Sequence, residues 1–178
     1  MWGDDNMKGF AVAIVVTALI TFDASAQAPQ AAPCSAPEAR QFDFWIGDWD
    51  VFEDGKLAGT NRIERVYGCV IHESWKSPEI SGQSLNVFDA KRGVWHQTWV
   101  DSNSGLLVIE GAWRNGSLAM SDATLAGKKD PKRMNEITWT PNSDGSVRQH
   151  WRASIDGGKT WSTVFDGKYV RSSRSQPK

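Results

Sequence analysis

Apolar and polar residues alternate with a period of two through most of the chain after about residue 44. Short stretches rich in Trp, Val, Ile, Thr and Phe recur about every 8 to 14 residues, and turn-forming residues separate them. This spacing is typical of an antiparallel meander of β-strands. The ten predicted strands cover residues 44–53, 59–67, 69–76, 83–89, 94–101, 106–114, 117–122, 134–140, 146–155 and 160–170.

Turn-forming dipeptides support this division of the chain. Asp54-Gly55 and Asn115-Gly116 suit type I′ hairpin turns, because both positions of each dipeptide tolerate a positive φ. Helical periodicity is confined to residues 10–20 and a short turn at 36–40. Short strands also occur in sandwiches and propellers, but the chain is too short for several four-stranded blades.

Hairpin after hairpin favours a closed barrel, because closure removes the unpaired edge strands of an open sheet. A barrel of about ten strands is also too wide for its own side chains to fill completely. We therefore predict an all-β fold, a closed or nearly closed antiparallel up-and-down barrel that contains a cavity.

The N-terminal residues have the pattern of a secretory signal peptide. Met7-Lys8 precedes the apolar run 10–20, and the small residues of 24–26 suit signal peptidase cleavage. The apolar run is shorter than the roughly 20 residues of a membrane-spanning helix. We expect translation to start at Met7, a signal peptide over 1–26 and a secreted or periplasmic protein; an uncleaved membrane anchor is the alternative.

The remaining chain divides into a Pro- and Ala-rich lead-in at 27–40, a barrel domain at 41–172 and a disordered tail at 173–178. An oxidising compartment favours a disulfide between Cys34 and Cys69 over a metal site or a thiol nucleophile. Two unpaired buried thiols are the alternative. The formal net charge of −1 gives no argument for a nucleic-acid or anionic-membrane partner.

Residues 42–51 (Phe-Asp-Phe-Trp-Ile-Gly-Asp-Trp-Asp-Val) carry a Gly-x-Trp triplet on the first predicted strand. This triplet resembles the signature of lipocalins and the wider calycin superfamily of ligand-binding barrels. Together with residues 68–75, 82–86 and 95–101, the stretch resembles a family of uncharacterised secreted bacterial proteins that carry a domain of unknown function. The resemblance covers most of the predicted mature chain and implies a calycin-like barrel, but it implies no activity.

The lipocalin resemblance also implies a structural role for several residues. In lipocalins the tryptophan of the triplet closes the base of the barrel, under an arginine from the end of the last strand. Gly47, Trp49 and Arg171 match these positions here, so Trp49 is expected to pack under Arg171 through a cation-π contact. Trp45 is expected to pack in the core nearby.

Residues 154–161 (Ser-Ile-Asp-Gly-Gly-Lys-Thr-Trp) match the Asp-box pattern of sialidase propellers. Sialidase propellers carry several copies, whereas this chain carries one. We therefore interpret Asp156 and Trp161 as structural residues of a hairpin turn, in which the Asp side chain accepts hydrogen bonds from backbone amides.

Strand alternation sorts the polar residues into two faces. Several polar residues share a face with tryptophans, and if that face points inward they form a sparse polar set within an aromatic wall, as in a ligand pocket. This candidate ligand-binding set comprises Glu73, Trp75, Trp95, Gln97, Trp99, Asp101, Gln149 and Trp151. The opposite parity holds Ser84, Asn86 and Phe88 on one strand and His150 with two arginines on another. Two alternatives stay open: some tryptophans face outward, or the polar residues only satisfy one another in the core.

The three histidines, His72, His96 and His150, lie on separate predicted strands and have no metal-ligand spacing in sequence. Some calycin-like barrels of the nitrobindin type bind haem through a histidine, so any of the three is a candidate axial ligand. A surface or hydrogen-bonded histidine is the alternative in each case.

We interpret the chain as a secreted β-barrel that binds a small apolar or amphipathic molecule and needs no cofactor to fold. An isomerase or hydrolase that uses Glu73 with His72 or His96 as acid and base is the second hypothesis, although neighbouring residues on a strand point to opposite faces. A structural or interaction module is the third. The sequence leaves the ligand and the oligomeric state open.

Overall fold

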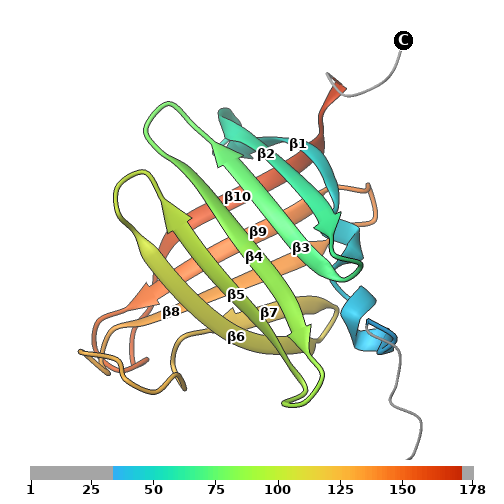
Figure 1. Ribbon diagram of the computed structural model, residues 1–178. Helices are drawn as coiled ribbons and strands as arrows, with labels where there is room; N and C mark the ends of the chain where they lie inside the picture. The colour runs from blue at the N-terminus through green and yellow to red at the C-terminus, as the bar shows by residue number, and fades with distance from the viewer. Residues whose placement is uncertain (1–33, 174–178) are drawn as a thin grey trace, which may run out of the picture. The chain divides into compact units, whose positions relative to one another are not determined.

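Ten antiparallel strands form one closed barrel in the computed structural model, which describes residues 34–173 (Figure 1). Each strand pairs with its neighbours in the sequence, and β1 pairs with β10 to close the sheet. The predicted all-β closed barrel is therefore confirmed. The strands are β1 (Gly47–Glu53), β2 (Lys56–Val66), β3 (Val70–Lys76), β4 (Ser81–Asp89), β5 (Val94–Asp101), β6 (Leu106–Arg114), β7 (Ser117–Ser121), β8 (Met134–Pro141), β9 (Val147–Ser154) and β10 (Ser162–Arg171).

The predicted signal peptide, most of the lead-in and the tail from residue 174 onward lie outside the described residues. Within the barrel, every strand boundary falls within three residues of its predicted position. The turn at Asp54-Gly55 has φ values of 48° and 75°, and the turn at Asn115-Gly116 has 50° and 79°. Positive φ at both positions is what a type I′ turn requires, so these dipeptides set the hairpins that flank them.

The prediction that the first strand begins at residue 44 is wrong. Two short 3₁₀ helices, η1 (Pro37–Arg40) and η2 (Asp43–Trp45), precede β1. Trp45 therefore lies in η2, where it is fully buried and stacks on Phe42 with ring centroids 4.7 Å apart. The apolar residues at 42, 44 and 45 pack at the base of the barrel on a compact turn, which backbone hydrogen bonds of 3.1 Å from Trp45 to Phe42 and from Ile46 to Asp43 close. The Trp45 carbonyl also accepts a hydrogen bond of 2.8 Å from the Trp49 indole.

The pairing of β1 with β10 places Trp49 opposite Arg171. The Arg171 guanidinium lies 3.9 Å from the centroid of the Trp49 ring, and its Nη1 donates a 2.6 Å hydrogen bond to the Ile46 carbonyl. A Cβ atom at Gly47 would come within 1.8 Å of Arg171 Nη1, and Gly47 has a φ of 143°. The Gly-x-Trp triplet thus combines a glycine that admits the arginine with a tryptophan that lies under it.

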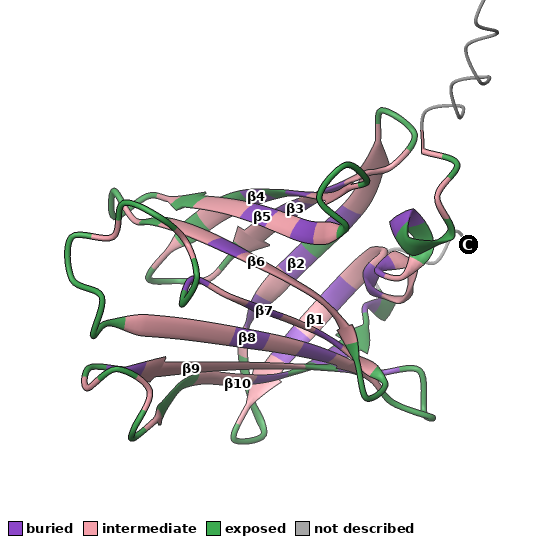
Figure 2. Ribbon diagram, turned by 90° about the horizontal axis from the view of Figure 1, so that it is seen from below, coloured by how far each residue is buried: buried purple, intermediate pink, exposed green. Residues whose placement is uncertain are grey.

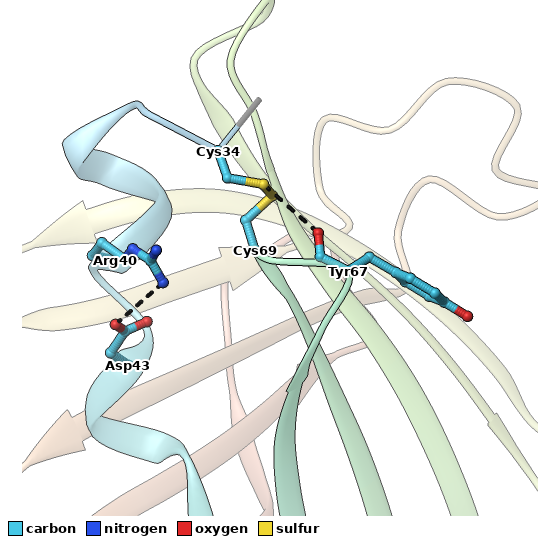
Figure 3. Close-up of a disulfide and its surroundings, with 5 residues drawn as sticks. All are labelled: Cys34, Arg40, Asp43, Tyr67 and Cys69. Atoms are coloured by element: carbon cyan, nitrogen blue, oxygen red, sulfur yellow. Dashed lines mark hydrogen bonds and ion pairs between the residues drawn. A yellow bond between two sulfur atoms is a disulfide. The ribbon is translucent and has the colours of Figure 1, made fainter. Parts of the chain in front are cut away.

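The predicted disulfide between Cys34 and Cys69 is confirmed, and Figure 3 shows it beside η1. Cys69 lies in the turn between β2 and β3, so the bond fastens the segment before η1 to that turn. Arg40 and Asp43 form an ion pair of 4.0 Å between the two 3₁₀ helices. These links hold the segment that fills the barrel base.

Buried positions alternate along the strands, and exposed residues gather in the loops (Figure 2). The fully buried side chains come from the 3₁₀ segment and from nearly every strand. The main cluster comprises Phe42, Trp45, Trp49, Val51, Ile63, Ile71, Trp95, Ile109, Leu118, Met120, Ile137, Trp139, Val147 and Tyr169. Because most of its rings gather around Phe42 and Trp45, the base end of the barrel is densely packed.

Replacing both Cys34 and Cys69 by Ser is expected to lower the free energy of unfolding by about 4 kcal/mol, because the bond closes a loop of 35 residues in the unfolded chain. Urea unfolding with and without a reducing agent measures this. The reductant should shift the wild-type transition and leave the double variant unchanged; a wild type that is insensitive to a reductant shown to open the bond would contradict the prediction.

Replacing Arg171 by Ala is expected to cost roughly 1–2 kcal/mol, since it removes the cation-π contact and leaves the Ile46 carbonyl without that donor. Arg148→Ala is the matched control, because Arg148 pairs with Asp166 on the exposed outer face and such pairs contribute less. Equal losses in urea unfolding for the two variants would show that the Trp49 contact has no special weight.

Candidate functional site

A cavity of about 280 Å³ lies inside the barrel beyond the packed base. Its walls come from β3, β5, β6, β8, β9 and β10 and from the loop between β3 and β4. The lining residues are Glu73, Trp75, Ile80, Gln97, Trp99, Asp101, Leu107, Ile137, Gln149, Trp151, Val164, Phe165 and Tyr169. Seven of the eight residues in the candidate ligand-binding set therefore meet around one space, and Trp95 is the exception.

Trp95 does not line the cavity, because alternation along a strand gives the face of a residue and not its height in the barrel. Trp95 lies near the base end of β5, is fully buried, and packs edge-on against Phe42 at 5.6 Å between ring centroids. Its indole nitrogen donates a 3.2 Å hydrogen bond to Gln41 Oε1. Its place is in the base cluster, two residues below Gln97.

Aromatic side chains make up much of the cavity wall. Trp75 packs edge-on against Phe165 across the barrel, with ring centroids 6.0 Å apart. The indole nitrogen of Trp99 donates to Asp101 Oδ2 at 3.0 Å, and that of Trp151 donates to Asn135 Oδ1 at 2.9 Å. Because these N–H groups have fixed partners, the two indoles present mainly their apolar ring surfaces to other contacts.

The mouth side of the wall depends on an irregularity in β10. The register between β9 and β10 shifts between Thr163 and Phe165, so β10 contains a bulge at this point. A bulge lets consecutive residues aim at the same side of a sheet. Val164 and Phe165 both line the cavity for this reason, although Val164 is also 48% exposed.

A hydrogen-bonded group of polar side chains, here called the polar belt, crosses the barrel interior beside the cavity. Glu73 is its centre: Glu73 Oε1 accepts a 2.7 Å hydrogen bond from Asn61 Nδ2, and Oε2 accepts one of 2.6 Å from Ser84 Oγ. Tyr169 extends the belt toward β9, because its hydroxyl accepts from Asn61 at 3.3 Å and donates to Gln149 Oε1. The belt comprises Asn61, Glu73, Ser84, Asn86, Gln97, Gln149 and Tyr169.

The belt continues along β4 and β5. Asn86 Nδ2 donates to Ser84 Oγ at 2.9 Å and to the Ile71 carbonyl at 3.1 Å. Gln97 Nε2 donates to Asn86 Oδ1 at 2.7 Å. Among the described residues, Gln97 Oε1 and Gln149 Nε2 have no hydrogen-bond partner, and both side chains line the cavity. The belt therefore offers the cavity one acceptor and one donor as well as the Glu73 carboxyl.

Placing Ser84 and Asn86 on the parity opposite to the tryptophan face was wrong: both are buried inside the barrel. β4 carries no tryptophan, and its residue Leu85 is 51% exposed on the outer face, so hydrophobicity alone gives the wrong side. The turn at 90–93 would have predicted the correct face of β4. It pairs Asp89 with Val94 and therefore Asn86 with Gln97, which lies on the tryptophan face of β5. Asn61 and Tyr169 were not singled out by the sequence reasoning.

Burial dominates the electrostatics of the belt. Desolvation raises the pKa of Glu73, against the opposing effect of the Ser84 and Asn61 hydrogen bonds. Desolvation and the nearby Glu73 carboxylate raise the pKa of Tyr169 well above its ordinary value. Asp101 at the mouth behaves in the opposite way, since hydrogen bonds from Trp99 and from the Gly105 amide lower its pKa. Asp101 is therefore ionised at neutral pH, while Glu73 favours its neutral form more than a free side chain does.

The three histidines lie on the outer face. His72 contacts Gln83 Oε1 at 3.2 Å, His96 contacts Glu110 and Thr98 at 2.9 Å, and His150 contacts Thr163 Oγ1 at 3.1 Å. Their strand neighbours Glu73, Gln97 and Gln149 point inward. None of the three histidines can thus ligate a haem held in the cavity or act there with Glu73. In the described part of the chain, no group of three or more His, Cys, Asp or Glu side chains could hold a metal ion.

The Asp-box sequence forms the loop between β9 and β10. Asp156 Oδ1 accepts hydrogen bonds from the Lys159 and Thr160 amides at 3.0 and 2.9 Å. The Thr160 hydroxyl and amide contribute most to lowering the pKa of Asp156 to about 2. Trp161 closes the loop by donating to the Gly158 carbonyl at 3.0 Å. The side-chain hydrogen bonds of Asp156 and Trp161 are therefore made within the turn itself.

A larger hollow of about 730 Å³ adjoins the cavity and shares Trp75 and Asp101 with it. Its walls include exposed or half-exposed polar side chains from the outer face of β2 to β5, among them Arg62, Lys76 and Gln83. A surface of this kind stays hydrated. The interior cavity is the better candidate site because its wall is mainly aromatic and aliphatic.

No family model matches the chain. One curated protein, described as a WD repeat-containing protein WDS homolog from Arabidopsis thaliana, is 25% identical over 139 residues. The match covers 69% of this chain and 25% of that protein, so the chain spans about a quarter of the length of the relative. This similarity is too low to show a family. No helix among the described residues has the length and apolar character that crossing a membrane would require.

Replacing Glu73 by Gln is expected to flatten the pH dependence of stability. A carboxyl whose pKa is raised in the folded state favours folding most at low pH, and this contribution declines as pH rises above the ordinary value of 4.5 toward the raised one. Urea unfolding from pH 4 to 9 should thus show a decline in the wild type that is smaller in Glu73→Gln.

Glu64→Gln is the matched control for this comparison. Glu64 lies on the outer face of β2 and pairs with Arg62, so the same chemical change is made outside the barrel. The control should follow the wild-type pH profile. An unchanged slope in Glu73→Gln, or an equal change in both variants, would show that burial of Glu73 does not set the slope.

Proposed function

We propose that the chain is a binding protein that holds one small apolar or amphipathic molecule in the barrel cavity. The observation that carries the proposal is the cavity itself, with its aromatic wall and the few polar groups of the belt along one side. Ligand pockets typically combine an apolar lining with a small number of placed polar groups that orient the ligand. The resemblance to secreted calycin-like barrels supports the same reading.

The size of the cavity limits the ligand. A volume of about 280 Å³ equals that of about nine water molecules in the liquid, at roughly 30 Å³ each. This volume lies just below the usual range for ligand pockets, roughly 300 to 1,000 Å³. We therefore infer a ligand of about ten non-hydrogen atoms, or the end of a longer molecule whose remainder extends through the mouth.

The disulfide and the N-terminal sequence support a cellular setting outside the cytosol. A disulfide persists in secreted or periplasmic proteins, where thiols are not kept reduced. Together with the predicted signal peptide, the Cys34–Cys69 bond supports a protein that meets its ligand outside the cytosol. The acid–base alternative loses support, because His72 and His96 point away from the cavity that Glu73 lines.

Retention of a ligand can be tested on the purified protein. The protein is incubated with a metabolite and lipid extract, freed of unbound molecules by gel filtration and analysed by native mass spectrometry. Quenching of tryptophan fluorescence follows the same binding, because Trp75, Trp99 and Trp151 line the cavity. We expect the wild type to retain a small molecule in one-to-one stoichiometry.

Replacing Val164 by Trp is expected to reduce retention about tenfold or more, since the added ring would occupy the cavity at its mouth. Val170→Trp is the matched control: it is the same substitution on the same strand, at an exposed position that does not line the cavity. A wild type that retains nothing, or a Val164→Trp variant that binds as well as the control, would refute the proposed site.

A further inference from the structure

The cavity has an uneven distribution of charge. Two carboxyl groups line it, Glu73 deep in the wall and Asp101 toward the mouth. None of the described residues that line the cavity is Lys, Arg or His. A ligand with an anionic head group would lie near these carboxylates without a compensating cation, which opposes binding most strongly where water is excluded.

The hydrogen-bonding groups around the cavity also favour a donor. Glu73 is 4% exposed, and each of its oxygens accepts one hydrogen bond from the belt. A carboxylate oxygen has two lone-pair sites, so each can accept a further hydrogen bond. Gln97 Oε1 has no partner in the described part of the chain, since the amide donates through Nε2. Gln149 Nε2 is the donor on the opposite side, where it suits an oxygen or a π system of the ligand.

The aromatic wall adds a third feature. Trp75, Trp99 and Trp151 line the same space as Phe165 and Tyr169. The faces of such rings attract cations, and tryptophan attracts them most strongly. Aromatic rings beside carboxylates, without a basic side chain, form the type of site that recognises organic ammonium ions.

We propose that the ligand is a small organic ammonium ion, an apolar body with a protonated or quaternary amine that lies beside Glu73 and the cavity tryptophans. This inference rests on the proposed function, because it names the chemistry of the molecule that the cavity holds. The ammonium group favours the ionised form of the buried Glu73 carboxyl and compensates its charge. The apolar body occupies the space between Trp75, Trp99 and Trp151. Asp101, ionised at the mouth, attracts the cation toward the entrance.

Three probes with one apolar body separate the possible head groups. Isothermal titration calorimetry at pH 7 measures the binding of 2-phenylethylamine, 2-phenylethanol and 3-phenylpropanoate to the purified full chain. We expect the amine to bind at least about tenfold more tightly than the alcohol, a difference of about 1.4 kcal/mol, and the carboxylate to bind most weakly.

Variants assign the preference to the carboxyl groups. Glu73→Gln is expected to reduce the ratio of amine to alcohol affinity to less than about threefold. Glu64→Gln, which removes the same charge from the outer face, should retain the wild-type ratio. Asp101→Asn gives an independent reading if Glu73→Gln does not fold, and it should lower the ratio by a smaller factor.

The outcomes distinguish the two proposals. An alcohol or carboxylate that binds as tightly as the amine overturns the ammonium inference and leaves the binding function intact. A preference for the amine that persists in both Glu73→Gln and Asp101→Asn overturns it as well. If no probe binds, the molecule retained from the extract decides: one without an ammonium group overturns the inference, and the absence of any retained molecule refutes both proposals.

Discussion

The pairing of β1 with β10 is the constraint on which the rest of this structure depends. Without it, the ten strands would form an open sheet with two exposed edges and no interior. The contacts at this seam are specific: Arg171 from β10 covers Trp49 of β1 and also binds the carbonyl of Ile46, directly before β1. The same contacts fix the direction from which the 3₁₀ segment enters the barrel. The same contacts of Arg171 therefore close the barrel and position the segment that fills its base. The disulfide fastens the start of this segment to the turn between β2 and β3.

The two halves of the barrel interior are filled differently. Phe42 and Trp45 bring aromatic volume that the strands do not supply at that end, and they pack with Trp95 and Trp139. No comparable insertion reaches the mouth half among the described residues, where side chains from six strands and Ile80 of the β3–β4 loop surround a cavity of about 280 Å³. The polar belt lies beside this space. An interior of this width thus has a dense apolar end, a hydrogen-bonded belt and an open aromatic end.

Much of this architecture can be predicted from local sequence patterns. The predictions fail at residues whose position depends on contacts that no local pattern indicates. Asp54-Gly55 and Asn115-Gly116 specify their hairpins, and tryptophans mark the inward face of β3, β5 and β9. The face of β4 depends on register, which the turn at 90–93 transmits to Asn86 through its pairing with Gln97. The inward position of Asn61 is harder to predict from the sequence. The register of β1 with β2 shifts between Val51 and Phe52, so counting residue pairs from the Asp54-Gly55 turn gives the wrong partner for Asn61. Trp95 differs again, since it packs against Phe42, a residue outside the sheet that the strand pattern does not place.

The position of Glu73 gives the strongest argument that the cavity is more than a packing defect. A barrel whose only requirement is stability gains more from an apolar side chain there, because burial of a carboxyl opposes its ionisation and costs free energy. Six other side chains from β2, β4, β5, β9 and β10 are then linked to it directly or in sequence, namely Asn61, Ser84, Asn86, Gln97, Gln149 and Tyr169. Proteins depart from the rules of a stable core mainly at functional sites. A carboxyl held by its neighbours at the wall of an aromatic cavity has a physical purpose once a cation lies beside it, because the ligand then supplies the charge that the fold withholds.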